Sequence, residues 1–256
     1  MSNLQKTMAL QFNAITPSRA VDEIELQIRT MIADGILTPG DRLPSERELA
    51  AQFKVSRNTL REAIRSLEYA GIVQMRKGAT GGAYIMKGNS GAIVGGLRVL
   101  YHLGAITPQH LTEARIWFSE IIVRVACERA TEHDLQMLEE NIEAMSDAHN
   151  RAAFDERQKL NREFHLILAR ITRNPIIISM MDAVMDVMGL FIDQIGPGEN
   201  PFTLPSRRRL MKHLHSRNAD RAVDEMNNYL IRLQSGYLNR WALKQSRPDI
   251  NTPDAE

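Results

Sequence analysis

The sequence predicts a mostly α protein in two parts. The first is an N-terminal domain of three helices and a small β-hairpin, and the second is an all-α bundle of six or seven helices. Apolar residues recur at helical spacing through most of the chain, whereas short strand patterns are confined to residues 72–86. A small, polar, glycine-bearing segment, residues 87–92, is typical of a linker. We therefore expect domains over residues 1–86 and 93–245, and a disordered polar tail over 246–256.

A chain of 256 residues has room for two domains, and its charge is divided unevenly between them. The formal net charge is +1, but residues 1–90 carry twelve Lys and Arg against nine Asp and Glu, which leaves −2 on the remainder. Such a small basic excess argues only weakly for a nucleic-acid partner. The single cysteine, Cys127, excludes an intramolecular disulfide and a Cys-based zinc or iron–sulfur site within one chain. Its apolar helical surroundings predict a buried hydrophobe.

Neither a secretory signal nor a membrane partner is expected. The N-terminus lacks a charged start, a continuous apolar segment and a small-residue cleavage site. The most apolar run, residues 176–192, falls short of the roughly 20 apolar residues of a membrane span, and Asp182 and Asp186 interrupt it. These features predict a cytoplasmic protein.

Start and stop signals divide the N-terminal domain into short elements. In chain order they are a helix over 18–34, a short helix from Ser45 to Phe53, a helix from Ser56 to Ala70, and strands over 72–76 and 82–86. Ser45-Glu-Arg-Glu48 is a capping box, Ser56 caps the next helix after a two-residue turn, and Gly71 ends that helix. Two helices joined by a tight turn and followed by a hairpin predict a winged helix-turn-helix with a β-hairpin wing.

Polar residues at the start of the helix after the turn favour DNA binding over a purely structural domain. In a helix-turn-helix this end enters the major groove, where Arg pairs with guanine and Asn with adenine. The candidate residues there are Ser56, Arg57, Asn58, Thr59 and Arg61. Arg47 lies on the preceding helix, which crosses the DNA backbone, and Lys77 and Gly78 form the wing tip, where they can approach the minor groove. For Arg65, a phosphate contact and a solvated surface position are both open.

The segment over residues 39–85 resembles the DNA-binding domain of the GntR family of bacterial transcription regulators. The motifs LPSERELA and VSRNTLREAI and the glycine-bearing wing occur in the order and at the spacing of that family. The resemblance implies dimeric binding to short pseudo-palindromes. It also implies operator contacts by Arg47, Ser56, Arg57, Thr59, Arg61, Lys77 and Gly78.

Cap and proline signals divide the C-terminal part into helices. The expected helices cover residues 93–103, 107–130, 131–148, 153–172, 174–195, 206–217 and 220–244. Thr107-Pro108 and Asn174-Pro175 each place a capping residue before a proline at the first helical position. Because no strand pattern and no repeat of fixed period occurs here, the sequence predicts a helical bundle.

The order of these helices, and the motif FHLILARITRNPII, resemble the FCD ligand-binding domain of FadR-like GntR regulators over about residues 109–233. In many such domains an Asp, a His four residues later and two His on the last helices hold a divalent metal, which in turn holds a small carboxylate effector. Residues i and i+4 share one helix face, so both side chains can reach one ion.

This chain departs from the metal-binding pattern. Asn161, His165, Arg207 and Tyr229 occupy the four positions, and an amide, one imidazole, a cation and a phenol are poor metal ligands. We therefore expect no metal and no other cofactor. Arg207 takes the place of the ion and holds the effector anion directly, while Asn161, His165 and Tyr229 add hydrogen bonds. Arg115, which matches the arginine of the family's E-x-R motif, completes the candidate effector site.

Other interpretations of these residues stay open. A lone histidine is often a core or surface residue, and the run Arg207-Arg208-Arg209 is typical of a solvated face. An alignment shifted by one turn would bring His213 or His215 to the site and restore a metal. The methionines over residues 180–188 suit the core, a dimer contact or a pocket for an apolar or aromatic acid.

These features predict an effector-responsive, DNA-binding transcription regulator that acts as a homodimer on double-stranded operator DNA. The expected form is a repressor of a catabolic operon that a small organic acid releases. The alternatives are an architectural DNA-binding dimer without an effector, and an activator that responds to an acyl or aromatic ligand. The sequence contains no Gly-rich phosphate loop, no GxSxG elbow and no HExxH motif, which argues against an enzyme.

Overall fold

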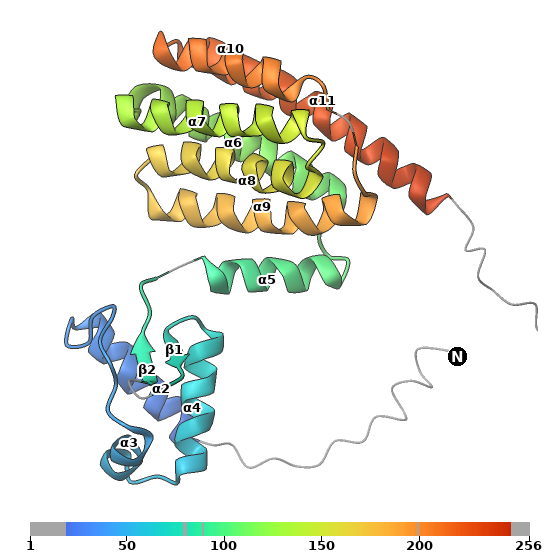
Figure 1. The fold of residues 1–256 in the computed structure, drawn as a ribbon. Coiled ribbons are helices and arrows are strands. Elements are labelled where there is room, and N and C mark those ends of the chain that lie inside the picture. The colour runs from blue at the N-terminus through green and yellow to red at the C-terminus, as the bar shows by residue number, and fades with distance from the viewer. Residues whose placement is uncertain (1–18, 79–80, 89, 199, 247–256) are drawn as a thin grey trace, which may run out of the picture. The chain divides into compact units, whose positions relative to one another are not determined.

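The computed structural model describes residues 19–78, 81–88, 90–198 and 200–246, and within these the fold is mostly helical with one two-stranded hairpin (Figure 1). The chain divides into two compact units, residues 1–89 and 90–256. Apart from Ser246, the tail expected over residues 246–256 lies outside the described residues.

The N-terminal unit has the predicted helices and hairpin. Its elements are α2 (Arg19–Ala33), α3 (Glu46–Phe53), α4 (Arg57–Tyr69), β1 (Val73–Arg76) and β2 (Gly82–Ile85). The two strands pair antiparallel, with Val73 opposite Ile85, and a bridge from Arg42 to Tyr84 attaches the loop before α3 to the hairpin. The core joins residues from all five elements, namely Ile24, Ile28, Leu49, Leu60, Ile64, Leu67, Val73, Ala83 and Ile85.

Side-chain caps set the start of both helices of the helix-turn-helix. The Ser45 hydroxyl accepts the Glu48 amide at 3.3 Å, and the Glu48 carboxylate accepts the Ser45 amide at 2.9 Å, which is the predicted capping box. Lys54 follows α3 with a φ of 55°, the left-handed conformation that turns the chain. Ser56 then accepts the Thr59 amide at 3.1 Å and caps α4. These contacts fix where α4 begins, and therefore which residues its first turn presents.

The C-terminal unit contains seven helices among its described residues. They are α5 (Gly91–His102), α6 (Pro108–Arg129), α7 (Glu132–Asn150), α8 (Phe154–Ile171), α9 (Pro175–Ile195), α10 (Thr203–His215) and α11 (Ala219–Gln245). Two starts differ from the sequence prediction. Helix α5 begins at Gly91, inside the expected linker, since Leu97 and Tyr101 pack against α9 and hold the segment in a helix. Helix α10 begins at Thr203 and not at Ser206, because Phe202 and Leu204 pack on the bundle core.

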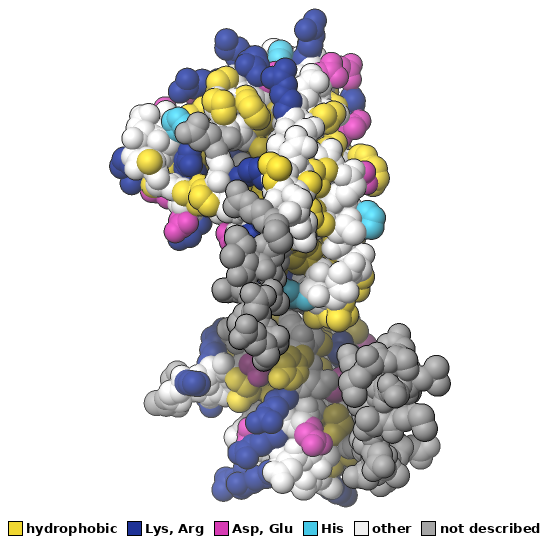
Figure 2. All heavy atoms as spheres, turned by 90° about the vertical axis from the view of Figure 1, so that its right-hand side faces the viewer, with side chains coloured by type: hydrophobic (Ala, Val, Ile, Leu, Met, Phe, Trp, Pro, Cys, Tyr) yellow, Lys and Arg dark blue, Asp and Glu magenta, His cyan; other side chains and the backbone are white. Residues whose placement is uncertain are grey.

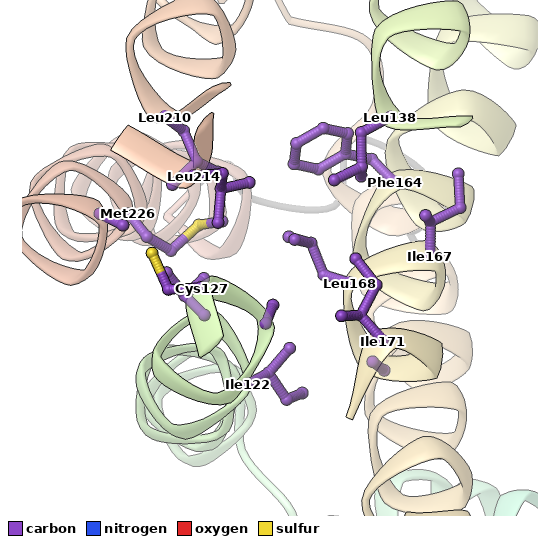
Figure 3. Packing of buried hydrophobic residues seen from close by; sticks show 14 of the residues in the cluster. Ile122, Cys127, Leu138, Phe164, Ile167, Leu168, Ile171, Leu210, Leu214 and Met226 are labelled. Atoms are coloured by element: carbon purple, nitrogen blue, oxygen red, sulfur yellow. The ribbon is translucent and has the colours of Figure 1, made fainter. Parts of the chain in front are cut away.

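Apolar side chains from six helices, α6 to α11, form the central cluster of this bundle, part of which Figure 3 shows. Ile122 and Cys127 of α6 face Leu168 of α8 across the cluster, and α10 and α11 close it with Leu214 and Met226. Cys127 is 1 % exposed, and burial raises the pKa of its thiol. The cysteine is therefore the small buried hydrophobe that its surroundings predicted.

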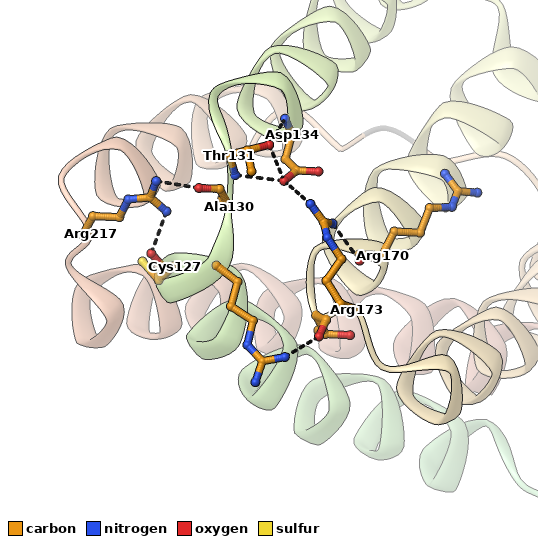
Figure 4. Close-up of polar contacts among 9 residues, drawn as sticks. Cys127, Ala130, Thr131, Asp134, Arg170, Arg173 and Arg217 are labelled. Atoms are coloured by element: carbon orange, nitrogen blue, oxygen red, sulfur yellow. Dashed lines mark hydrogen bonds and ion pairs between the residues drawn. The ribbon is translucent and has the colours of Figure 1, made fainter.

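Helix ends on one side of the bundle are tied together by arginines (Figure 4). Arg217 donates to the carbonyl oxygens of Cys127 and Ala130 at 3.0 and 2.6 Å, and so satisfies the last turn of α6. Asp134 caps α7 with Thr131 and accepts from Arg173 at 2.7 Å. Burial raises the pKa of Asp134, but the hydrogen bonds from Arg173 and Thr131 outweigh burial and lower it to about 2.

Helix α9 is the one helix in the described part of the chain that is long and apolar enough by composition to cross a membrane. Here it serves as a core helix, with Met181, Val187 and Phe191 fully buried in the bundle. Two of its three carboxylates form ion pairs with arginines of neighbouring helices, Asp182 with Arg162 and Asp186 with Arg98.

Candidate DNA interface and effector pocket

The first turn of α4 presents two unpaired polar side chains. Arg57 and Asn58 are exposed, and neither has a hydrogen bond or ion pair within the described residues. Ser56 and Thr59 are already engaged with each other, because their hydroxyl oxygens lie 2.9 Å apart at the cap. Arg57 and Asn58 are therefore placed to reach base edges, whereas Ser56 and Thr59 position the helix end with its free amides and positive dipole.

A second set of cations lies beside this turn. The Nε of Arg61 donates to the Glu46 carboxylate of α3 at 2.8 Å, but its side chain is still 55 % exposed. An exposed pair of this kind is worth less than about 1 kcal/mol, so a phosphate can compete for the arginine. Arg47 on α3 and Arg65 on α4 are also exposed. In the lower part of Figure 2, Lys and Arg side chains gather along the visible face of this unit.

The wing presents a cation next to bare backbone. Lys77 is exposed, and Gly78 has a φ of 109° with no other atom within 4 Å of the place that a Cβ would occupy. That φ favours glycine, which leaves the backbone open to close approach by DNA. Gly81 closes the turn by donating to the Gly78 carbonyl at 2.8 Å. Residues 79 and 80 lie outside the described part.

In the C-terminal unit the five candidate effector residues come together from four helices. Arg115 of α6 and His165 of α8 lie 2.8 Å apart, between Nη2 and Nε2. Arg207 of α10 donates from Nη2 to the Oδ1 of Asn161 at 2.8 Å, and its guanidinium lies 4.1 Å above the ring of Phe164. Tyr229 of α11 shares a hydrogen bond of 3.3 Å with Thr203. The contact between Arg207 and Asn161 supports the alignment that placed Arg207 at a ligand position.

The two arginines are buried without an opposite charge. Arg115 and Arg207 are each 2 % exposed, and neither has a carboxylate partner among the described residues. The Nε atom of each also lacks a hydrogen-bond partner there. Burying an unpaired cation costs several kcal/mol, so this pair is poised to receive an anion.

The same burial controls the titration of the site. Burial, with the two arginines as a second cause, lowers the pKa of His165 well below its ordinary value. The imidazole is therefore neutral at physiological pH, and its Nε2 can accept a hydrogen bond from Arg115. Burial also lowers the pKa of Arg207 to about 10, which leaves its guanidinium charged at neutral pH.

A cavity of about 230 Å³ is lined by two of the five candidate residues, whereas Arg115, His165 and Arg207 are buried behind its wall and do not line it. Asn161 and Tyr229 form part of its wall, and Met185, Met188 and Ile192 form an apolar side. The remaining wall carries cations and no Asp or Glu from the described residues. A ligand in this cavity would meet Asn161, the residue that holds Arg207.

Comparisons with known proteins match both units. The family described as "Bacterial regulatory proteins, gntR family" matches residues 20–84, and the FCD domain matches residues 110–232. The chain is 32% identical over 183 residues to the HTH-type transcriptional repressor NanR of Escherichia coli, which covers 69% of this chain and 67% of that protein.

The chain belongs to the GntR family. It is a DNA-binding transcription regulator of the FadR-like type and not an enzyme. A solved GntR protein of Streptococcus agalactiae has a similar structure, with a TM-score of 0.63 and 26% identity over 84% of this chain and 99% of that one.

The residues of this GntR-family regulator do not fit the metal that many FCD domains hold. The Nε2 of His165 and the Oδ1 of Asn161, the atoms that would face an ion, each meet an arginine instead. His215 pairs with Glu139 on the surface, about 12 Å along α10 from Arg207, so a shifted alignment does not restore the site through His215, whereas the alternative through His213 stays a prediction. The described residues contain no group of three or more His, Cys, Asp or Glu suited to an ion.

Two residues that contact the candidate effector residues have no place in the sequence prediction. Asn141 of α7 receives a hydrogen bond of 3.4 Å from Arg207, and Tyr237 of α11 lies beside Arg115 and lines the cavity. Asn141 had a signal, because it is a polar residue in the apolar stripe formed by Leu138, Ile142 and Met145. No feature of the sequence distinguishes Tyr237, since an aromatic residue at such a position normally packs in the core.

Proposed function

We propose that this GntR-family regulator is a homodimeric repressor that leaves its operator when a small organic acid binds in the C-terminal unit. The pair of buried, uncompensated arginines, Arg115 and Arg207, carries the proposal. A carboxylate is the natural ligand of a guanidinium, because the two groups match in charge and in planar, forked geometry. The site residues are Arg115, Asn161, His165, Arg207 and Tyr229, without a metal.

The NanR relative is named a repressor, which supports repression as the sign of regulation. A protein that acts on chromosomal DNA in bacteria works in the cytoplasm. For induction, the acid must bind the DNA-incompetent state more tightly, and DNA must weaken acid binding by the same factor. Coupling of about 1–3 kcal/mol is sufficient for a useful response.

The effector part is tested with an operator fragment selected by the protein from random duplexes. Fluorescence anisotropy measures its release by a panel of small carboxylates. Arg207→Gln should abolish release while leaving DNA affinity intact, and Arg209→Gln is the matched control, because Arg209 is exposed and paired with Glu225. If no acid binds the wild type or releases its DNA, the bundle is a dimerisation module and the protein is an architectural DNA binder.

The DNA part is tested at Arg57. Arg57→Ala should cost about 1–3 kcal/mol on the selected operator and much less on random DNA, provided Arg57 contacts a base. Arg65→Ala, on the same helix, is the control for a side chain limited to phosphate. Equal losses on both DNAs for Arg57→Ala would exclude base contact.

A further inference from the structure

We call the proposed effector site of Arg115, Asn161, His165, Arg207 and Tyr229 the inner site. The wall of the adjoining cavity also carries cationic side chains that do not belong to the inner site, and we call this part of the wall the mouth. Three permanent cations of α8 line it, namely Arg157, Lys159 and Arg162. Arg162 is paired with Asp182, but Arg157 and Lys159 have no carboxylate partner within the described residues. Arg157 instead contacts the Nδ1 of His149 at 3.3 Å, and that histidine also lines the cavity. Two unneutralised charges therefore face the same space.

Helix geometry aligns this mouth with the inner arginines. Arg157, Asn161 and His165 are four residues apart on α8, so they share one face. At a rise of about 1.5 Å per residue, Arg157 lies about 6 Å along the helix axis from Asn161 and about 12 Å from His165. Asn161 both lines the cavity and holds Arg207. A ligand in the cavity therefore meets the outer cations at one end and Asn161, which accepts from Arg207, at the other, beside the apolar wall of α9.

We propose that the effector carries two anionic groups joined by a largely apolar spacer. The inner group binds at Arg115 and Arg207, and the outer group, a carboxylate or a phosphate, binds at Arg157 and Lys159. The inference rests on the proposed function and adds the ligand class: a dianionic acid is preferred over a monocarboxylic acid of the same length.

Isothermal titration calorimetry on the full chain tests this preference. The probes are succinate, glutarate, adipate and pimelate, each compared with the monocarboxylate of equal length. The best dicarboxylate should bind at least about tenfold more tightly than its partner, the factor that one charged hydrogen bond supplies. Arg157→Gln should reduce the advantage to less than about threefold, whereas Arg170→Gln, an exposed arginine near the other end of α8, should preserve it.

Two results would overturn the proposal of a two-group ligand, and they have different consequences for the proposed function. Equal affinities within every pair would exclude the outer subsite but leave an acid-responsive regulator standing. No binding by any of these acids would exclude both the two-group ligand and the proposed effector site.

A separate observation connects the mouth with the beginning of the unit. Asp182 of α9 accepts hydrogen bonds from two side chains, Arg162 at the cavity and Ser90 at the first residue of the unit. Ser90 stands at the N-cap position of α5, yet its side chain caps no amide. Its backbone is helical, with φ −70° and ψ −4°, whereas a capping serine is normally extended.

Ser90 therefore has two competing uses for its hydroxyl. We infer that the outer anionic group, held by Arg157 and Lys159, also attracts Arg162 of the same cavity wall and draws it away from Asp182, which loses the partner that fixes its orientation. Ser90 then turns to cap α5, and the change of ψ at Ser90 redirects the chain that leads into the unit. This relay rests on the proposed function. It assigns the coupling between acid binding and operator release to Arg162, Asp182 and Ser90.

The test is the factor by which the tightest-binding dicarboxylate weakens operator affinity in anisotropy titrations. Asp182→Asn and Ser90→Ala should bring this factor close to one while acid binding persists in calorimetry. Asp186→Asn is the matched control, because Asp186 connects α9 with α5 through Arg98, and neither of these two residues lines the cavity. If the dicarboxylate weakens operator affinity by the wild-type factor in Asp182→Asn and Ser90→Ala, the relay is wrong. The relay is also wrong if Asp186→Asn loses the effect equally. Either result leaves the proposed function standing, because the wild-type protein still releases its DNA.

Discussion

Arg207→Met is expected to stabilise the ligand-free protein while removing its response to acids. The guanidinium of Arg207 is 2 % exposed, lies over the Phe164 ring and has no carboxylate partner among the described residues. Methionine has a similar length without the charge, and its thioether makes favourable contacts with aromatic rings. The variant therefore removes a buried charge without leaving a large cavity.

The magnitude follows from the titration of the site. Burial lowers the pKa of Arg207 from its ordinary value to about 10, which corresponds to about 3 kcal/mol of unfavourable free energy for the charged form in the folded state. Both states are protonated at pH 7, so the full cost is present there and is relieved only as the pH rises above about 10. The variant also loses hydrogen bonds to Asn161 and Asn141, worth about 1 kcal/mol each. The net gain is about 1 kcal/mol, or about 2–4 °C in Tm.

Urea denaturation followed by circular dichroism measures the change, and calorimetry measures acid binding in the same preparations. Arg209→Met is the control, because an exposed pair with Glu225 should cost at most about 1 kcal/mol when it is broken. A loss of more than about 2 kcal/mol in Arg207→Met would refute the reasoning that the charge destabilises the free protein. Acid binding at wild-type affinity would refute the role of Arg207 in the pocket.

Three further outcomes follow from the structure. Glu46→Gln frees Arg61 from its ion pair and should raise operator affinity about threefold in anisotropy titrations; weaker binding would show that Arg61 does not reach DNA. Asp134 has a folded pKa of about 2, so its contribution to stability is present above about pH 4 and is lost as the pH falls toward 2; the deficit of Asp134→Asn in urea titrations should therefore be larger at pH 7 than at pH 3. Treatment with EDTA should leave acid affinity unchanged in calorimetry, because arginines meet the atoms that would face a metal, and a tenfold loss would contradict this.

The fold was largely predictable because its helix starts carry side-chain caps. Ser45, Ser56 and Thr107 each accept the backbone amide that their spacing predicted, and such local hydrogen bonds depend on few distant contacts. The starts of α5 and α10 were placed wrongly, since neither has a side-chain cap. Packing against distant helices sets those starts, and a local pattern does not contain that information.

The inner site was recognisable only through the resemblance to the FCD domain. In the run of three arginines, sequence alone does not say which one is buried. The phase of α10 decides it, because Arg207 falls in line with the buried Leu210, Met211 and Leu214, while Arg208 and Arg209 face outward. The cations of the cavity mouth gave no distinct signal, because charged residues in the first turns of a helix are ordinarily solvated.

Under the proposed function, an arginine in place of a metal changes what limits the response of the regulator. A divalent ion must be supplied by the cell and competes with protons for its ligands, whereas a guanidinium is charged at every physiological pH. His165 adds no pH dependence, since burial keeps its imidazole neutral. The ligand-free protein instead holds a buried charge at a cost of about 3 kcal/mol, and a bound carboxylate relieves that cost. This free energy is of the size that allosteric coupling requires. Arg207→Met removes the cost of the buried charge permanently, whereas a bound acid would remove it only in the liganded state. Under the proposed function, that difference is the free energy available to favour the state that releases DNA.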